Sequence, residues 1–129
     1  MDYLFPLGRV LFAAFFLNSA YGHFKNVDMM AGYSAAKGVP APKLAVLGTG
    51  TLLLLGGLGV ILGMWVQWAL LCLVLFLVPV TFMMHAYWKV TDPAARMNER
   101  MNFLRNLALL GAIFMMYFIP TPWAMSIGH

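Results

Sequence analysis

The sequence predicts an all-α fold, a four-helix transmembrane bundle with a short interfacial helix in the first loop. The chain has 129 residues, of which 63% are hydrophobic and 9% charged, whereas a soluble domain carries roughly 25% charged residues. Its apolar residues also form long stretches, near the ~20 residues that a helix needs to cross a bilayer. A chain this short cannot bury so much apolar surface in its own core, so we expect one membrane domain over residues 1–129.

The spans are predicted from long apolar runs that contain few or no charged residues. The second span contains no charge, the third has His85 near its end, and the fourth carries Arg105 and Asn106 in its first turn. Continuous hydrophobicity, without turns at the spacing of barrel strands, favours helices over a transmembrane barrel. The four predicted spans are about residues 4–22, 44–64, 66–88 and 101–119.

Capping residues predict two further helix boundaries. Asn26 can cap a short amphipathic helix over residues 27–37, which Gly38 ends. This helix would lie on the membrane or be tucked over the bundle. Asp92 followed by Pro93 predicts the start of the last helix, well before its span. That first segment, outside the membrane core, would carry Arg96, Glu99 and Arg100.

The basic residues predict how the chain is oriented. The net charge is +4, and seven of the eight Lys and Arg residues lie in or beside the first and third loops. The positive-inside rule places these loops in the cytoplasm and both termini outside. Anionic lipid headgroups are the natural partners of basic residues beside a membrane, so no nucleic-acid partner is expected. Arg9, on the opposite side, is expected to anchor the first helix, with its long side chain reaching outward.

Glycines in the second span predict close helix packing. Gly59 and Gly63 form a G-x-x-x-G pair, and such small residues let two helix backbones approach closely in a membrane. We expect the pair to serve packing within the bundle, with a homodimer face as the alternative. Cys72 is the single cysteine and lies in mid-span, where it fits a small buried hydrophobic residue.

Three spans bring polar side chains to one membrane level, on the side of the basic loops. Three interpretations remain open: structural side chains at the interface, a site for a quinone or another lipid-like ligand, or axial ligands of a haem. No H-x-x-x-H or cysteine spacing supports a metal site. The candidate cofactor-binding residues are His23, His85, Trp88, Asp92, Arg105 and Asn106.

Five segments follow one another along the chain: FFLNSAYGHF (15–24), KGVPAPKLA (37–45), LLGGLGVILG (54–63), HAYWKVTDPAAR (85–96) and NFLRNLALLG (102–111). In this order they resemble the DoxX family of small bacterial integral membrane proteins. The resemblance implies four membrane-spanning helices and a place in the bacterial inner membrane. It also implies a redox association, since the family is named for similarity to DoxD, the small subunit of a terminal quinol oxidase linked to thiosulfate:quinone oxidoreduction. The six candidate residues match recurring segments of the family.

Together these observations predict a small polytopic membrane protein that is a quinone-linked or accessory subunit of a membrane redox complex. Its partners would be the lipid bilayer and other membrane redox subunits, and it would not be a stand-alone enzyme. The alternative is a purely structural subunit of a larger membrane assembly, with no cofactor of its own. A small transporter is a weaker third alternative, because no acidic residue lies in mid-membrane.

Overall fold

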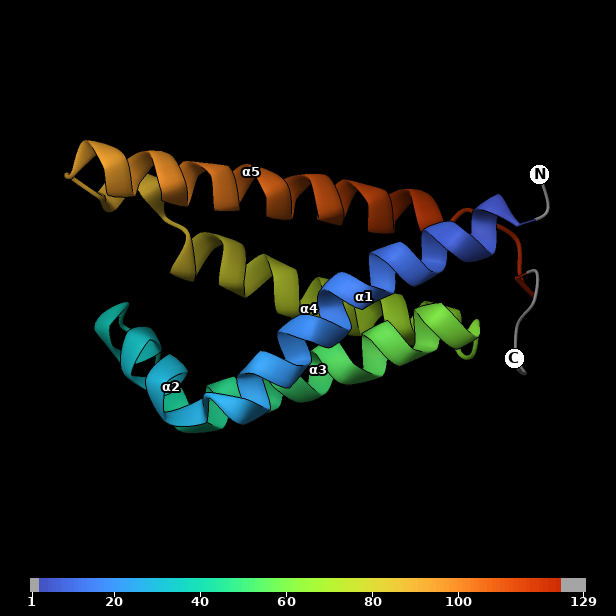
Figure 1. The fold of residues 1–129 in the computed structure, drawn as a ribbon, viewed down its shortest axis with the longest axis horizontal. Helices are drawn as coiled ribbons and strands as arrows, with labels where there is room; N and C mark the ends of the chain where they lie inside the picture. The colour runs from blue at the N-terminus through green and yellow to red at the C-terminus, as the bar shows by residue number, and fades with distance from the viewer. Residues whose placement is uncertain (1–2, 124–129) are drawn as a thin grey trace.

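The computed structural model describes residues 3–123, and this part of the chain is helical, without a β-strand. Figure 1 shows the elements as elongated, roughly parallel and antiparallel rods. The all-α prediction is therefore confirmed. The elements are α1 (Leu4–Lys25), α2 (Val27–Ala36), α3 (Pro42–Leu62), α4 (Val66–Met84), the short 3-10 helix η1 (Tyr87–Lys89) and α5 (Pro93–Met116).

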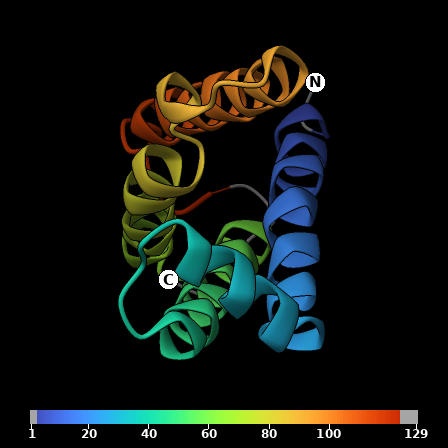
Figure 2. The same cartoon turned by 90° about the vertical axis from the view of Figure 1, so that its left-hand side faces the viewer.

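The long helices pack in a chain of neighbours. α3 lies between α1 and α4, and α5 packs on α4 and η1. Viewed end-on, α5 runs across the top and α1 down the right-hand side, facing α4 on the left, with α2 nearest the viewer (Figure 2). α2 packs mainly against α3. It is therefore tucked over the bundle, which is one of the two placements that the sequence allowed.

Within the described residues, three helical segments are long and apolar enough to cross a membrane: Leu4–Lys25, Pro42–Leu62 and Val66–Lys89. By the length and composition of the described helices, three spans are supported rather than the four that were predicted. The predicted span over residues 101–119 falls short because α5 ends at Met116 and carries Arg105 inside the proposed span.

Local signals placed the helix boundaries well. The Asp92 carboxylate accepts a hydrogen bond from the Ala95 amide at 2.9 Å, as expected of the residue that caps α5. Gly38 follows α2 with a φ of +84°, a left-handed conformation that glycine adopts without strain. Asn26 does precede α2, but its side chain makes no capping bond.

Several glycines of α3, Gly59 among them, lie at contacts inside the bundle, which is the packing role expected of the Gly59 and Gly63 pair. A Cβ atom at Gly59 would overlap the Cβ of Ala69 on α4, and one at Gly57 would crowd Leu17 of α1. Gly63 instead ends α3, with a φ of +68°. These close approaches bring α1 and α4 onto opposite sides of α3 and so set the width of the bundle.

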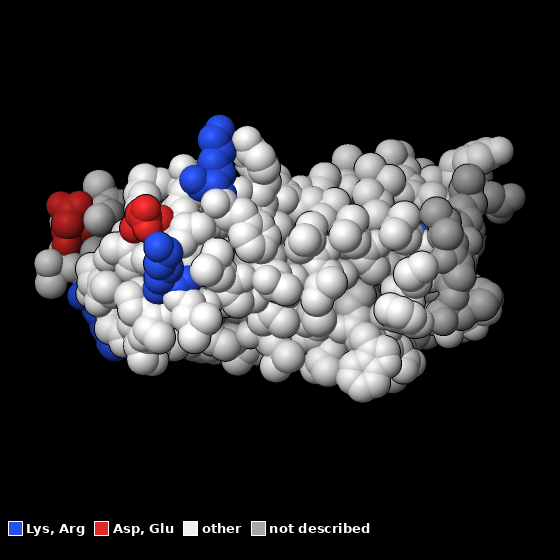
Figure 3. Space-filling model, turned by 90° about the horizontal axis from the view of Figure 1, so that it is seen from below, with Lys and Arg blue, Asp and Glu red and all other residues white. Residues whose placement is uncertain are grey.

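Charged side chains gather at one end of the molecule. In Figure 3 almost all the visible Lys, Arg, Asp and Glu atoms lie toward the end that carries α2, and the remaining length of that face is uncharged. The connections from α1 to α3 and from α4 to α5 lie at this charged end, and the α3–α4 turn lies at the other (Figure 1). The fold thus places the charged residues at one end of the bundle, as the sequence indicated.

Candidate ligand-binding site

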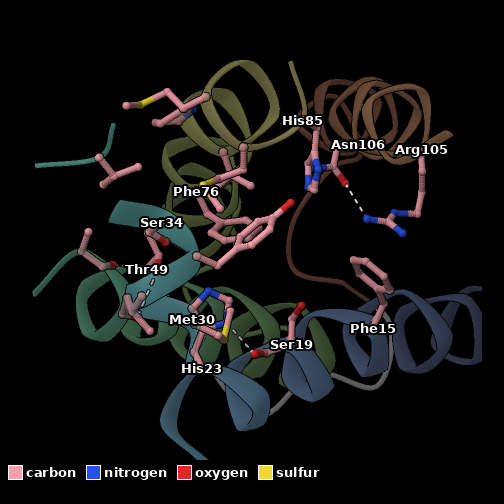
Figure 4. A pocket seen from close by; sticks show the side chains of 18 residues that line it. Phe15, Ser19, His23, Met30, Ser34, Thr49, Phe76, His85, Arg105 and Asn106 are labelled. Atoms are coloured by element: carbon pink, nitrogen blue, oxygen red, sulfur yellow. Dashed lines mark hydrogen bonds between the residues drawn. The ribbon is translucent and has the colours of Figure 1, made fainter. Parts of the chain in front are cut away.

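A cavity of about 320 Å³ lies near the charged end of the bundle, and every α-helix contributes to its wall. Most of the lining is apolar, supplied largely by α4. Figure 4 shows side chains converging on the cavity from all sides. The polar or charged lining residues are Ser19, His23, Tyr33, Ser34, Thr49, His85, Arg105 and Asn106.

His23 lies in the last turn of α1 and is buried. Its Nδ1 lies 2.7 Å from the carbonyl oxygen of Ser19, one turn earlier. Because a carbonyl can only accept, Nδ1 must carry the proton of this bond. The ring also meets the edge of Phe76 at a centroid distance of 5.9 Å, and Gly50 leaves room for the His23 side chain. The imidazole is therefore fixed in both tautomer and position.

His85 terminates α4, where the backbone leaves helical geometry. Its Nδ1 lies 3.5 Å from Oε1 of Glu99 on α5. This nitrogen is buried and makes no hydrogen bond within residues 3–123. The second predicted histidine thus lines the cavity with one ring nitrogen directed at a carboxylate.

Arg105 and Asn106 reach the cavity from α5. Asn106 is buried, and its side-chain oxygen accepts a bond from Nη2 of Arg105 at 3.5 Å. Nη1 of Arg105 donates to Oδ1 of Asn102 at 3.2 Å. The guanidinium lies 5.3 Å from the ring centre of Phe15 on α1, a cation–π contact. This contact links α5 to α1 along the cavity wall.

The other two candidate residues lie away from the cavity wall. Trp88, on η1, packs edge-to-face on Phe103 at a centroid distance of 5.5 Å. Asp92 is occupied as the cap of α5. The structure therefore brings together His23, His85, Arg105 and Asn106, but not Trp88 or Asp92.

Glu99 is a residue beside the candidate site that the sequence interpretation missed. It is only 8% exposed, although the sequence placed it on a segment outside the membrane core. Its Oε1 accepts a bond from Asn102 at 3.2 Å, and its Oε2 pairs with Nζ of Lys37 at 3.4 Å. A signal was present, since Glu99, Asn102 and Asn106 are spaced i, i+3, i+7 and so share one helix face.

Opposing effects act on the Glu99 carboxyl, which precedes the predicted span of α5. Burial raises the pKa of Glu99, while the bond from Asn102 and the neighbouring His85 and Lys37 lower it. The favourable partners outweigh burial, so the pKa lies below the usual range of a glutamate. The carboxylate is therefore an anion at neutral pH, enclosed among basic groups.

Potential metal ligands are dispersed in this chain. Over residues 3–123, no group of three or more His, Cys, Asp or Glu side chains is arranged to hold a metal ion. The two cavity histidines come from different helices and have different partners, a backbone carbonyl for His23 and a carboxylate for His85.

Long apolar helices, a charged end and a half-open cavity between the helices define a small integral membrane protein of helical-bundle architecture. The family model of DoxX matches residues 4–86, which is more than half of the chain. The chain therefore belongs to the DoxX family, as the resemblance indicated. No curated protein and no solved structure shows significant similarity to it. The matched region covers α1 to α4, so Arg105, Asn106 and Glu99 of α5 lie beyond it.

Proposed function

We propose that this protein binds a lipid-soluble ligand with a polar ring, a quinone in particular, and acts as a quinone-linked or accessory subunit of a membrane redox complex. The observation that carries this proposal is the cavity of about 320 Å³ with two imidazoles in its wall. Small-molecule sites typically have volumes of roughly 300–1,000 Å³, with mostly apolar walls and a few polar groups.

The cavity wall suits the two parts of such a ligand. Phe76, Val80 and Met83 supply apolar and aromatic surface for a ring and its hydrocarbon tail. His23 and His85 supply ring nitrogens that can accept a hydrogen bond from a ring hydroxyl, or donate one to a ring carbonyl when the imidazole is protonated. A quinone ring carries oxygens on opposite edges, and the two histidines enter the cavity from different helices (Figure 4).

The proposed placement in the membrane puts this cavity at the cytoplasmic interface. Seven basic residues cluster at its end of the chain, and the positive-inside rule assigns that end to the cytoplasm of a bacterial inner membrane. In this arrangement α5 is a fourth crossing helix, whose charged first turns stand at headgroup level. All of residues 1–129 then form one membrane domain.

A matched pair of threonines tests ligand binding. Thr49 lines the cavity, and Thr51, two residues later on α3, is exposed on the outside of the bundle. Both hydroxyls donate to the carbonyl four residues earlier, at 2.8 and 2.9 Å, so both variants lose the same kind of bond. Thr49→Phe should fill part of the cavity and weaken binding at least tenfold, whereas Thr51→Phe should leave binding unchanged.

The measurement is titration of the purified protein in detergent with decylubiquinone, followed by tryptophan fluorescence. Equal affinities for the two variants would contradict a site in this cavity. Failure of the folded wild-type protein to bind would contradict the quinone role and support the purely structural subunit.

The role as a subunit is tested separately, by purification under native conditions with a mild detergent. A co-purified complex that shows haem or flavin absorbance supports the proposal. A protein that migrates alone, without such absorbance, contradicts it.

A further inference from the structure

Three elements converge on the Glu99 carboxylate. Lys37 follows the last residue of α2, His85 follows the last residue of α4, and Glu99 lies in the second turn of α5. The distances are 3.4 Å from Lys37 Nζ to Oε2 and 3.5 Å from His85 Nδ1 to Oε1. Only His85 of the three lines the cavity. The carboxylate is thus placed behind the histidine, on the side away from a bound ligand.

This arrangement selects one tautomer of His85. A carboxylate only accepts hydrogen bonds, and within residues 3–123 the buried Nδ1 has no hydrogen-bond partner that would compete with Glu99. A proton on Nδ1 is therefore favoured, and the lone pair of the neutral ring then resides on Nε2. The 3.5 Å separation is longer than a hydrogen bond, and such contacts often tighten when a ligand binds.

Glu99 is also the anion that can offset a positive charge on His85. Burial of the ring is the largest effect that opposes such a charge, and the nearby cations Arg105 and Lys37 oppose it further, whereas Glu99 favours it. His23, on another helix, is held by the neutral carbonyl of Ser19 and has no comparable anion among its hydrogen-bonding partners. The two cavity histidines are therefore chemically unequal.

We infer that Glu99 is a positioning residue for His85, and that it makes the site selective for a ligand hydroxyl, the quinol form, over the corresponding carbonyl. This inference rests on the proposed function. Nε2 accepts a hydrogen bond from the ligand O–H. If the proton transfers, the O–H bond breaks, Nε2–H forms, the bonding electron pair stays on the ligand oxygen, and Glu99 stabilises the imidazolium. A quinone carbonyl has no proton to offer to Nε2.

The first test reads the tautomer without a ligand. In ¹⁵N-histidine NMR spectra at neutral pH, His85 of the wild-type protein should be protonated on Nδ1. Glu99→Met, which is unbranched and similar in length, should shift His85 toward the Nε2–H form and leave His23 unchanged. Asp28→Asn is the control, because it removes an exposed acid that pairs with Lys43, and it should alter neither ring. A wild-type His85 protonated on Nε2, or one insensitive to Glu99→Met, would overturn the inference.

The second test compares affinities for the quinol and quinone forms of decylubiquinone, with the quinol measured under anaerobic conditions. The wild-type protein should prefer the quinol, and Glu99→Met should reduce that preference about tenfold, because an Nε2–H no longer accepts from a quinol hydroxyl and can instead donate to a quinone carbonyl. An unchanged preference would contradict the positioning role. If Glu99→Met does not fold, Glu99→Leu serves, because it also removes both acceptor oxygens that face His85. If the wild-type protein binds neither the quinol nor the quinone, the proposed function is wrong. The NMR result would still decide whether Glu99 sets the tautomer of His85.

Discussion

Arg9 of α1 donates from Nε to the carbonyl oxygen of Val60, near the carboxyl end of α3, at a distance of 3.0 Å. Its Nη2 donates to the next carbonyl, that of Ile61, also at 3.0 Å. These carbonyls belong to the last turn, which lacks partners within the helix. Only 3% of Arg9 is exposed, so the side chain is buried in the bundle rather than reaching outward as the sequence suggested.

The two bonds from Arg9 should contribute measurably to stability. In Arg9→Lys the charge is retained, but an ammonium group lacks the planar fork that reaches two successive carbonyls. We expect a loss of about 1–2 kcal/mol in the free energy of unfolding, measured by thermal unfolding in detergent. Arg100→Lys is the control, since Arg100 is exposed, and it should have little effect. Equal stabilities for the two variants would show that the bonds contribute nothing.

Close packing of α3 on α4 gives a second prediction. Gly59→Ala places a Cβ against the Cβ of Ala69, so the two helices must move apart, at a cost of about 1–3 kcal/mol. Gly48→Ala on the same helix meets nothing within 4 Å and should be neutral or slightly stabilising, because alanine favours helix. The stability of both variants can be measured by thermal unfolding, with the reaction of Cys72 with a thiol-reactive dye as the signal for unfolding.

A compensating change sharpens this experiment. Ala69→Gly removes the clashing Cβ, so the double variant should recover part of the stability that Gly59→Ala loses. The recovery would be incomplete because glycine itself costs roughly 1 kcal/mol within a helix. If Ala69→Gly only adds to the loss, the assigned contact is wrong.

Stability should also depend on pH through Glu99. Because its pKa is lower in the folded protein, the ionised carboxylate stabilises the fold at any pH above the unfolded value, about 4.3 for a glutamate. This contribution is lost as the pH falls from there through the folded pKa. Unfolding temperatures measured between pH 7 and pH 3 should therefore decline at the acid end. Glu99→Gln should flatten that decline, and an unaltered profile would contradict this role.

Reporter fusions test the orientation. Alkaline phosphatase is active only outside the cytoplasm, so fusions at the α3–α4 turn after Met64 and at His129 should be active. A fusion after Lys89, between α4 and α5, should be inactive. Activity at Lys89 with none at Met64 would reverse the proposed orientation. If α5 does not cross the membrane, the fusion at His129 would instead match the one at Lys89.

Helix boundaries were predictable where a short-range signal sets them. Asp92 and Pro93 specify the start of α5 through local capping, and Gly38 ends α2 through its own backbone freedom. The end of α4, just before His85, was not predictable in this way. The predicted third span to residue 88 matches the apolar segment Val66–Lys89, but α4 itself ends at Met84 and the backbone then turns into η1. This turn carries Trp88 away from the cavity.

The candidate site was predictable in its depth but not in its partners. Loop charges and span lengths placed His23 and His85 at one end of the bundle, because depth follows from distance along a helix. Burial of Glu99 depends on the packing of α5 against α4 and on Lys37, which is 62 residues away in sequence. No local pattern reports such a contact, so a charged residue in an early helical turn was taken to face water.

The cavity wall has a consequence for how the protein is made. Four of the five α-helices have been synthesised by residue 84, yet α5 supplies Arg105 and Asn106 to the wall, and Glu99 behind it. A chain still leaving the ribosome therefore presents His85 without its carboxylate partner. The cavity wall is completed last, so the proposed ligand binding requires α5 to have been made and packed.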